Sequence, residues 1–426
     1  MKYVELDLGE EKLSGLLVKE DEKHLVIKLK NGYNIGISRR KVVDIKEKSE
    51  LKIEEVKSSD KIEQKHSLPK VLILHTGGTI ASKVDYRTGA TFPSFSPQDL
   101  IGMFPELKDS ARIESKLFRS MWSEDFRFAH YNLLAKEIES ELKKDPELKG
   151  VIIGHGTDTI HYTSAALGFI FEHLPIPVVI VGSQRSSDRG STDAAMNLVS
   201  ATTFIANTSL KGVFICMHEN MNDENCIILN GFNAKKLHSS RRDAFKQINS
   251  SPIARINYFS KEIEYLSEYP NSSLNSPGHL KLHLFDENLR IGIIYSHPNM
   301  FAEEFEYFMK GYDGLILVGT GLTNFPINEI DEFTKEHAKI KNVLKSLAEK
   351  IPLVMTLQTV YGTVNMNVYT TGRDLKELGI IGDHSSLCTE TAFIKLAWLL
   401  SQKLDPKEYF MQDLRGEFSS KGMDAE

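Results

Sequence analysis

The sequence predicts an α/β protein in which two parallel-sheet domains follow a small N-terminal β-barrel. From residue 70 onward, short apolar runs alternate with helical patterns of about ten to fifteen residues, which is typical of βαβ units. The runs are continuously apolar, as expected for strands that are buried on both faces of a sheet. The barrel is predicted from a series of short strand patterns within residues 1–45.

The N-terminal strand patterns are joined by turn signals, of which Asn31-Gly32 is the strongest hairpin indicator. The patterns read YVELDL, LSGLLVKE, HLVIKLK, YNIGIS and KVVDI. Basic and acidic residues are nearly balanced here, and the one basic run is 39–41. We therefore expect residues 1–48 to form a docking barrel for an unknown partner rather than a module that captures RNA. Residues 49–69 are charged and poor in apolar side chains, which predicts a linker.

The remaining chain divides into two α/β blocks. A large domain is expected over 70–265, with strand patterns VLIL, GVII, PVVIV and GVFI, and a smaller one over 285–426, with IGIIY, GLILV and PLVM. Between them, residues 246–285 are rich in turn signals and are expected to cross between the domains with some strands.

Composition excludes several classes of protein. The net charge is −6, with 41% hydrophobic and 26% charged residues, which gives no general attraction to nucleic acid or anionic membranes. The 3 cysteines have neither disulfide-framework nor metal-ligand spacing, so we expect them to be small buried side chains. The N-terminus lacks signal-peptide features, and no apolar run approaches the roughly 20 residues of a membrane span. A cytoplasmic protein without membrane association is therefore expected.

The sequence Thr76-Gly77-Gly78-Thr79 directly follows the first buried strand pattern. Glycine allows a tight turn there, and ligands of α/β sheets bind at the carboxyl ends of the strands. Thr79 is therefore a candidate nucleophile or ligand-binding hydroxyl, although a helix-capping threonine would have the same place. The spacing matches neither a dinucleotide fingerprint nor a Walker loop.

Two further segments carry polar groups near predicted strand ends. Tyr86 lies in SKVDYRTGA, a polar stretch that ends in glycine and suits a mobile lid. Ser123 and Glu124 lie in the loop RSMWSED, which combines hydroxyl and carboxylate groups. Both segments are candidates for contact with a substrate.

A hydroxyl, a carboxylate and an amine are supplied by Thr157, Asp158 and Lys236. Threonine is a poor nucleophile unless a base activates it, and a lysine can serve when a carboxylate assists proton transfer. Each residue also has a structural alternative, since Asp158 suits a helix N-cap and Lys236 an exposed position. His155, between two glycines, is better explained as a packed histidine than as a base. No H-x₃-H or CxxC pattern indicates a metal.

Together, TGGTIAS, HGTDT and AKKLHSSRRDAF closely resemble motifs of the L-asparaginase/glutaminase family, over about residues 71–398. The resemblance implies an asparaginase-like, two-domain amidohydrolase that forms and then hydrolyses an acyl-enzyme. It implies that Thr79 is the nucleophile, that Tyr86 is the lid tyrosine assisting it, and that Ser123 binds the substrate α-carboxylate.

The same resemblance assigns Thr157, Asp158 and Lys236 to the threonine–aspartate–lysine triad of the family, with the aspartate also binding the α-ammonium group. The backbone at Gly78 is expected to help stabilise the oxyanion. Glu124 occupies a substrate contact where many members have glutamine. Glu390 is a candidate for the acidic residue that a neighbouring subunit contributes in this family.

Over nearly the full length, the chain is similar to the D subunits of archaeal glutamyl-tRNA(Gln) amidotransferases. The segments NGYNIGISRRKV, HTGGTIASKVDYRTGA, GSQRSSDRGSTDAAMNL and AKKLHSSRRDAF carry this resemblance. It implies a glutaminase that passes ammonia from glutamine to a partner E subunit, which activates Glu-tRNA(Gln) with ATP and Mg²⁺. A homodimer within a heterotetramer is expected.

No cofactor is expected in this chain, which has no P-loop motif. The alternative enzyme is a free-standing cytoplasmic L-asparaginase with an accessory barrel. An inert binding module is a third possibility, but Thr79, Thr157, Asp158 and Lys236 are all present.

Overall fold

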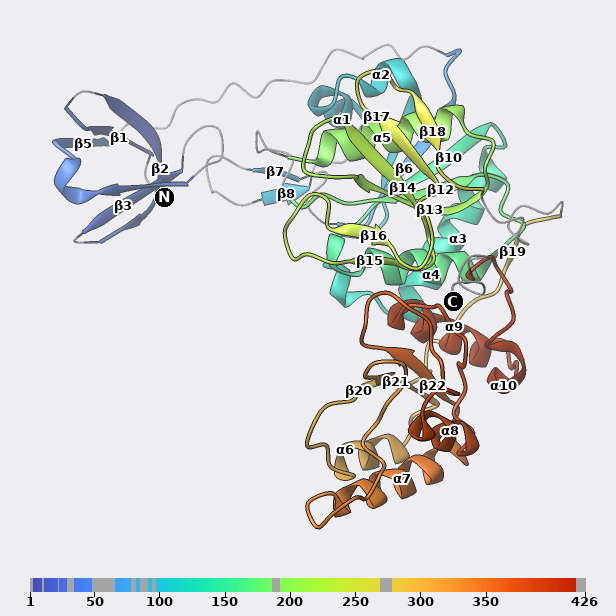
Figure 1. Cartoon of the computed structure of the whole chain (residues 1–426). Helices are drawn as coiled ribbons and strands as arrows, with labels where there is room; N and C mark the ends of the chain where they lie inside the picture. The colour runs from blue at the N-terminus through green and yellow to red at the C-terminus, as the bar shows by residue number, and fades with distance from the viewer. Residues whose placement is uncertain are drawn as a thin grey trace.

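The computed structural model shows an N-terminal sheet, a large α/β domain and a C-terminal α/β domain in chain order (Figure 1). The residues that the structure describes are 3–9, 11–21, 23–28, 34–47, 66–77, 82–84, 91–93, 97–185, 192–268 and 278–418.

The N-terminal domain is a five-stranded antiparallel sheet with strand order β4-β3-β2-β1-β5. Its strands are β1 (Tyr3–Asp7), β2 (Lys12–Glu20), β3 (His24–Lys28), β4 (Asn34–Ser38) and β5 (Asp44–Glu47). A small core of Val4, Leu6, Leu25, Ile27 and Ile37 lies against one face. The five short antiparallel strands agree with the small N-terminal β domain that the sequence predicts, and β4 and β5 are the outer strands of the described sheet.

The large domain is built on an eight-stranded sheet with the order β18-β17-β14-β13-β12-β10-β6-β9. Its parallel part contains β6 (Lys70–His75), β9 (Arg112–Leu117), β10 (Leu148–Gly154), β12 (Pro177–Val181) and β13 (Gly212–His218). The antiparallel part contains β14 (Asn225–Asn230), β17 (Ala254–Asn257) and β18 (Ile263–Tyr265). The predicted parallel strands form the core of the sheet, and three antiparallel strands extend it into a mixed sheet. Only residues 219–224 join β13 to β14, too few for a parallel crossover.

Alternate residues of the parallel strands enter two different cores, which explains why the strand sequences are continuously apolar. Leu72 and Leu74 of β6 pack with α3 (Phe128–Lys144) and α4 (Ile160–Ile170), whereas Val71 and Ile73 pack with α5 (Ala194–Asn207). The second core also includes Leu100 of α1 (Pro97–Met103) and Leu107 of α2 (Leu107–Ser110).

The C-terminal domain has a three-stranded parallel sheet of β20 (Ile291–Tyr295), β21 (Gly314–Gly319) and β22 (Leu353–Leu357). Its helices are α6 (Glu303–Glu306), α7 (Lys335–Ala348), α8 (Thr370–Glu377), α9 (Thr389–Ser401) and α10 (Pro406–Tyr409). Helix α9 packs against both α4 and β21, and Figure 1 shows it where the two domains meet. The first core of the large domain continues through α9 into this sheet.

The remaining short elements lie in connections. They are β7 (Ser82–Val84), β8 (Thr91–Pro93), β11 (Phe171–Glu172), β15 (Ala234–Lys236), β16 (Phe245–Gln247), β19 (Lys281–Leu282), and the 3₁₀ turns η1 (Arg39–Lys41), η2 (Ser123–Asp125), η3 (Thr157–Thr159) and η4 (Tyr307–Met309). β15 and β16 pair only with each other, separately from the large sheet.

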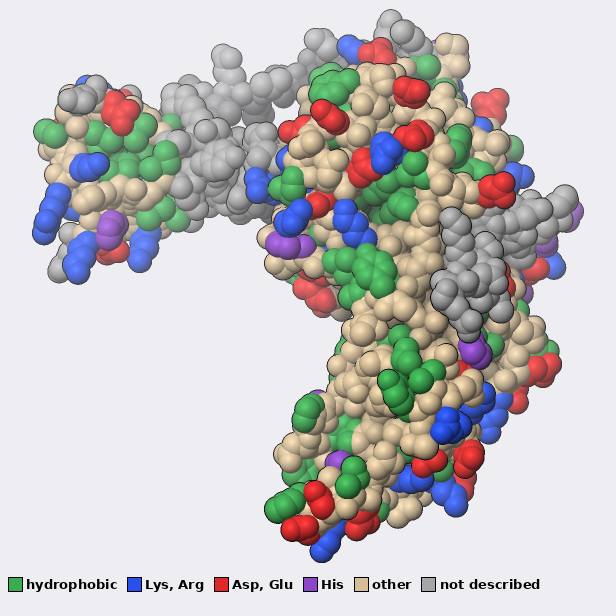
Figure 2. Space-filling model, viewed as in Figure 1, with side chains coloured by type: hydrophobic (Ala, Val, Ile, Leu, Met, Phe, Trp, Pro, Cys, Tyr) green, Lys and Arg blue, Asp and Glu red, His purple; other side chains and the backbone are tan. Residues whose placement is uncertain are grey.

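Surface charges of both signs are interspersed on the face shown in Figure 2. In the N-terminal sheet, Lys12 pairs with Asp7 at 3.8 Å and Lys19 with Asp21 at 3.4 Å. These pairs neutralise part of the charge on this sheet. In the described part of the chain, no helix is long and apolar enough to cross a membrane.

Because the N-terminal sheet has its own core, we expect residues 66–426 to fold without it. The shortened chain should keep its far-ultraviolet circular dichroism, with an unfolding midpoint within about 2 °C of the same transition in the full chain. Aggregation of the shortened chain, or a much lower midpoint, would show that the N-terminal sheet is part of the main fold.

Candidate active site

Several loops meet at the carboxyl edge of β9, β6, β10 and β12, as expected for neighbouring parallel strands. The Thr76 hydroxyl donates to the Gly154 carbonyl at 3.0 Å, which joins the loops after β6 and β10. The Met121 amide donates to the Thr76 carbonyl at 3.1 Å, which brings in the loop after β9. Residues 76–77 and the motifs MWSED and HGTDT are therefore neighbours in space.

Two glycines permit this close approach of the loops. Gly77 has a φ of +114°, and a Cβ at this position would lie 2.3 Å from the carbonyl oxygen of Met121. A Cβ on Gly156 would lie 2.9 Å from the Cβ of Ser123. Larger residues at either position would force the loops apart.

The structure brings together Thr157, Asp158 and Lys236, as the sequence predicts. Lys236 Nζ donates to Thr157 Oγ1 at 2.8 Å and to Asp158 Oδ1 at 2.7 Å. The lysine side chain is 9% exposed, whereas the aspartate side chain is 70% exposed. The Lys236 amine is therefore buried beside the Thr157 hydroxyl. The Asp158 carboxylate faces the solvent, from which a substrate would enter. This geometry suits proton transfer between amine and hydroxyl.

Ser123 lies next to this group. It is buried at the start of η2, and its carbonyl accepts a hydrogen bond from the Thr159 hydroxyl at 2.7 Å. Its own hydroxyl donates to Glu124 Oε2 at 3.3 Å, and Glu124 is exposed. The two residues predicted for substrate contact thus lie beside the η3 loop that carries Thr157 and Asp158.

Thr79, Gly78 and Tyr86 lie outside the described residues. Strand β6, which precedes Gly78 and Thr79 in the chain, ends at His75. In the sheet register His75 lies beside Gly154 of β10. The roles assigned to these three residues remain predictions.

Asp193 joins the two described ends of the loop after β12, residues 182–185 and 192–193, beside the site. This buried carboxylate accepts hydrogen bonds from the Ser183 hydroxyl at 2.9 Å and from the backbone amides of Gln184 and Arg185. The adjacent Gly182 packs closely against the methyl group of Thr157. Sequence reasoning did not single out Asp193, although it lies within the GSQRSSDRGSTDAAMNL segment.

His155 is a packed residue and not a solvent-accessible base. Its Nδ1 lies 2.7 Å from the Gly156 carbonyl, and its Nε2 lies 2.9 Å from Thr163 Oγ1. Burial lowers the pKa of His155 to about 4, so its ring is neutral near pH 7. Its role is to hold the loop that precedes Thr157.

Glu390 does not occupy the place expected of a residue donated to a neighbouring subunit. Its side chain is buried inside its own chain, with Oε1 2.7 Å from Lys235 Nζ. A carboxylate enclosed in this way has no free face for another copy. Local sequence could not reveal this, because the pair joins residues 155 positions apart.

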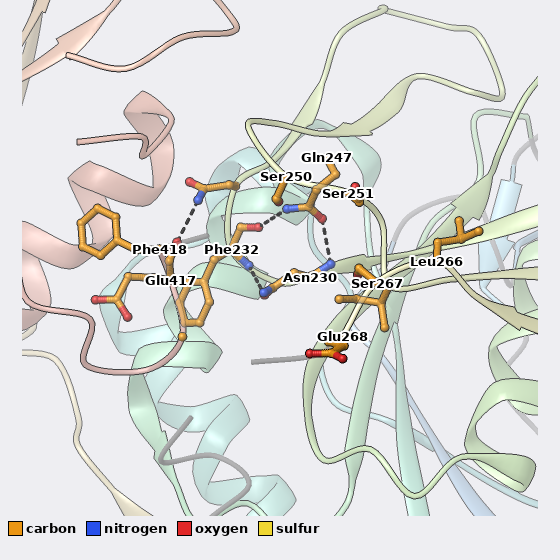
Figure 3. A pocket seen from close by; sticks show the side chains of 13 residues that line it. Asn230, Phe232, Gln247, Ser250, Ser251, Leu266, Ser267, Glu268, Glu417 and Phe418 are labelled. Atoms are coloured by element: carbon orange, nitrogen blue, oxygen red, sulfur yellow. Dashed lines mark hydrogen bonds between the residues drawn. The ribbon is translucent and has the colours of Figure 1, made fainter. Parts of the chain in front are cut away.

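All three cysteines are buried and free, as the sequence predicts. Among the described residues, no group of three His, Cys, Asp or Glu side chains could hold a metal ion. A separate cavity of about 330 Å³ is lined by residues that include Asn230, Phe232, Gln247, Ser267 and Glu417 (Figure 3). Its lining includes none of the residues predicted for catalysis.

Three family models match the chain and follow its division into domains. Residues 2–47 match the GatD N-terminal domain, residues 70–270 match Asparaginase, N-terminal, and residues 290–410 match the Glutaminase/Asparaginase C-terminal domain.

Relatives are similar over nearly the whole length. The D subunit of the glutamyl-tRNA(Gln) amidotransferase of Methanococcus maripaludis is 38% identical, covering 98% of this chain and 97% of that protein. The protein of the same name from Pyrococcus furiosus is 40% identical, covering 90% of this chain and 84% of that protein. Among solved structures, the thermostable L-asparaginase from Thermococcus kodakarensis has a TM-score of 0.71 at 27% identity, covering 82% of this chain and 99% of that one.

Because the folded-state pKa of His155 lies below its ordinary value of 6.5, folding is penalised as the pH falls from 6.5 toward 4. One such histidine costs roughly 1.4 kcal/mol for each pH unit in this window. Thermal unfolding midpoints measured between pH 7 and 5 should therefore fall more steeply for the wild type than for His155→Gln. Parallel curves for the two proteins would contradict the neutral, buried state of His155.

Proposed function

The chain belongs to the family of glutamyl-tRNA(Gln) amidotransferase D subunits, whose α/β domains are those of an asparaginase-type amidohydrolase, and we propose that it hydrolyses glutamine to provide ammonia for conversion of Glu-tRNA(Gln) to Gln-tRNA(Gln). Within the site, this function is supported by one observation: Lys236 donates hydrogen bonds to both Thr157 and Asp158 at the carboxyl edge of the sheet. The N-terminal domain, which the family model for these subunits matches, favours the amidotransferase over a free-standing asparaginase.

The reaction requires two acyl transfers. The Thr79 hydroxyl oxygen adds to the amide carbonyl of glutamine, its proton passes to the departing nitrogen, and the C–N bond breaks to release ammonia. A water molecule then attacks the resulting ester, its proton returns to the Thr79 oxygen, and glutamate leaves. The net reaction is glutamine and water giving glutamate and ammonia.

Lys236 and Thr157 are the groups we assign to proton movement. Protonated Lys236 donates to both neighbours, and loss of one proton leaves an amine that accepts from the Thr157 hydroxyl at the same 2.8 Å distance. The exposed Asp158 carboxylate is placed to bind the α-ammonium group of the amino acid substrate. Ser123, beside the same loop, is assigned to the substrate's α-carboxylate, and Glu124 to a second contact with the substrate. Tyr86 is assigned to the lid, and the backbone at Gly78 to the oxyanion.

The ammonia is used by a partner subunit in this proposal. The described chain offers the amide-hydrolysing site, so ATP, Mg²⁺ and activation of the tRNA-bound glutamate are assigned to a partner E subunit. We further propose a homodimer of this chain within a heterotetramer, working in the cytoplasm, where aminoacyl-tRNA is made. The near balance of basic and acidic residues in the N-terminal segment supports a docking role toward protein rather than RNA.

The function is tested by ammonia release from glutamine and from asparagine. It should be measured with the chain alone and with the purified partner, ATP, Mg²⁺ and Glu-tRNA(Gln). We expect glutamine to be the preferred amide, with release stimulated by the complete mixture and matched by Gln-tRNA(Gln) formation. Fast asparagine hydrolysis by the lone chain, unaffected by the mixture, would instead identify a free-standing asparaginase.

Replacing Lys236 removes the amine that donates to Thr157 and Asp158, and it should abolish turnover without unfolding the chain. Lys236→Met should lower kcat at least about 1000-fold, because grouped catalytic residues act as a unit. Lys339→Met, which removes an exposed lysine paired with Glu336, is the matched control and should retain wild-type rates. A loss of only a fewfold in Lys236→Met would exclude Lys236 from proton transfer.

A further inference from the structure

The strand that carries Lys236 is fastened to the C-terminal domain by the residue next to it. Lys235 Nζ donates to Glu390 Oε1 at 2.7 Å, and Glu390 lies in the first turn of α9. Successive side chains of a strand point to opposite faces. Lys235 therefore reaches into the domain junction, while Lys236 reaches the Thr157 hydroxyl.

Asn233 provides a second attachment immediately before this strand. Its Nδ2 donates to the Glu417 carbonyl at 2.9 Å, and its Oδ1 accepts from the Cys388 amide at 3.1 Å. Its backbone amide donates to Thr391 Oγ1 at 3.1 Å. The residue is buried with a φ of 53°, a conformation that asparagine adopts more readily than most residues. Figure 3 shows Glu417 beside Phe232, the neighbour of Asn233.

The Lys235–Glu390 pair is ionised although it is largely enclosed. Burial is the largest single influence and works to raise the pKa of Glu390, but the Lys235 ammonium group, together with smaller contributions from its surroundings, holds that pKa below its usual value. Burial likewise works against protonation of Lys235, and Glu390 nevertheless raises the pKa of the lysine. His161, 3.9 Å from Glu390, has a pKa lowered by burial to about 4 and does not compete as a cation near pH 7.

β15 is supported from two sides. The large sheet holds the chain before it, since the Gly231 amide donates to the Val213 carbonyl of β13 at 2.9 Å and the Asn230 amide of β14 donates to Gln247 Oε1 of β16 at 2.8 Å. The three-residue strand β15 pairs only with β16, and the two form a sheet of their own. Its contacts with α9 and with the turn at Glu417 add a second support, from the C-terminal domain, to the backbone that carries Lys236. A displacement of about 1 Å in a catalytic group can reduce a rate about 100-fold.

We propose that Lys235 and Glu390 form a positioning pair that holds Lys236 within hydrogen-bond distance of Thr157, so that the C-terminal domain contributes to the geometry of the amidohydrolase site. The inference rests on the proposed role of Lys236 in amide hydrolysis. Neither member of the pair takes part in proton transfer, because both lie on the opposite side of β15 from Thr157.

The test compares Lys235→Met, Glu390→Leu and the double variant in the assembled enzyme. Each single variant should lower kcat for glutamine about 10- to 100-fold and change KM less than about threefold, since the substrate contacts remain. Each also leaves one charge of the pair without its partner, buried in the case of Glu390 and partly buried in the case of Lys235, and should unfold at lower temperature. The double variant removes both charges, so its unfolding midpoint should recover while its kcat stays low.

Recovery of kcat together with stability in the double variant would overturn the proposal, because the pair would then serve stability alone. The same conclusion would follow if the single variants kept wild-type kcat. Lys341→Met is the matched control, since it breaks another 2.7 Å ion pair, to Asp374, outside the β15 junction. It should leave kcat unchanged.

A readout independent of activity is the crystal structure of the double variant. We expect the distance from Lys236 Nζ to Thr157 Oγ1 to increase from 2.8 Å to beyond hydrogen-bond reach. An unchanged distance would contradict the positioning role. If the wild-type assembly released no ammonia, the proposed function would fail, while this distance would still decide whether the pair positions Lys236.

Discussion

The hydrogen bond between Lys236 and Thr157 is the interaction on which the chemistry of this site depends. It joins two segments 79 residues apart and requires both to be held precisely enough for a 2.8 Å contact. Thr157 is placed by the loop after a central parallel strand, supported by His155 and by the close packing that Gly156 and Gly182 allow. Lys236 is placed from the other side, by a short strand that is tied to α9.

Much of the fold could be predicted because each buried strand packs against two hydrophobic cores, one on each face of the sheet. Val71 and Ile73 face one core and Leu72 and Leu74 the other, so burial on both faces leaves a continuous apolar run in the sequence. The grouping of Thr157 and Asp158 with Lys236 was also predictable, from motifs that resemble a known family. The N-terminal strands were predictable from their alternation and their turns.

The features that sequence could not predict depend on contacts between distant residues. The antiparallel half of the large sheet follows from short connections, and β14, with the sequence NCIILN, resembles a parallel core strand until its connection is known. Glu390 has the residue type of an acid that a neighbouring copy could contribute, yet packing turns it toward Lys235. Asn233 carries no motif, and its role emerges only where the two domains meet.

The most direct test of the central claim is covalent labelling with a diazoketone analogue of glutamine, followed by mapping of the modified peptide by mass spectrometry. We predict one adduct per chain, on Thr79, because the nucleophile and the Lys236–Thr157 group must serve the same substrate. The adduct should be absent when excess glutamine is present. Labelling of a different residue, or no labelling of an assembly that hydrolyses glutamine, would contradict the assignment of Thr79 as the nucleophile of this site.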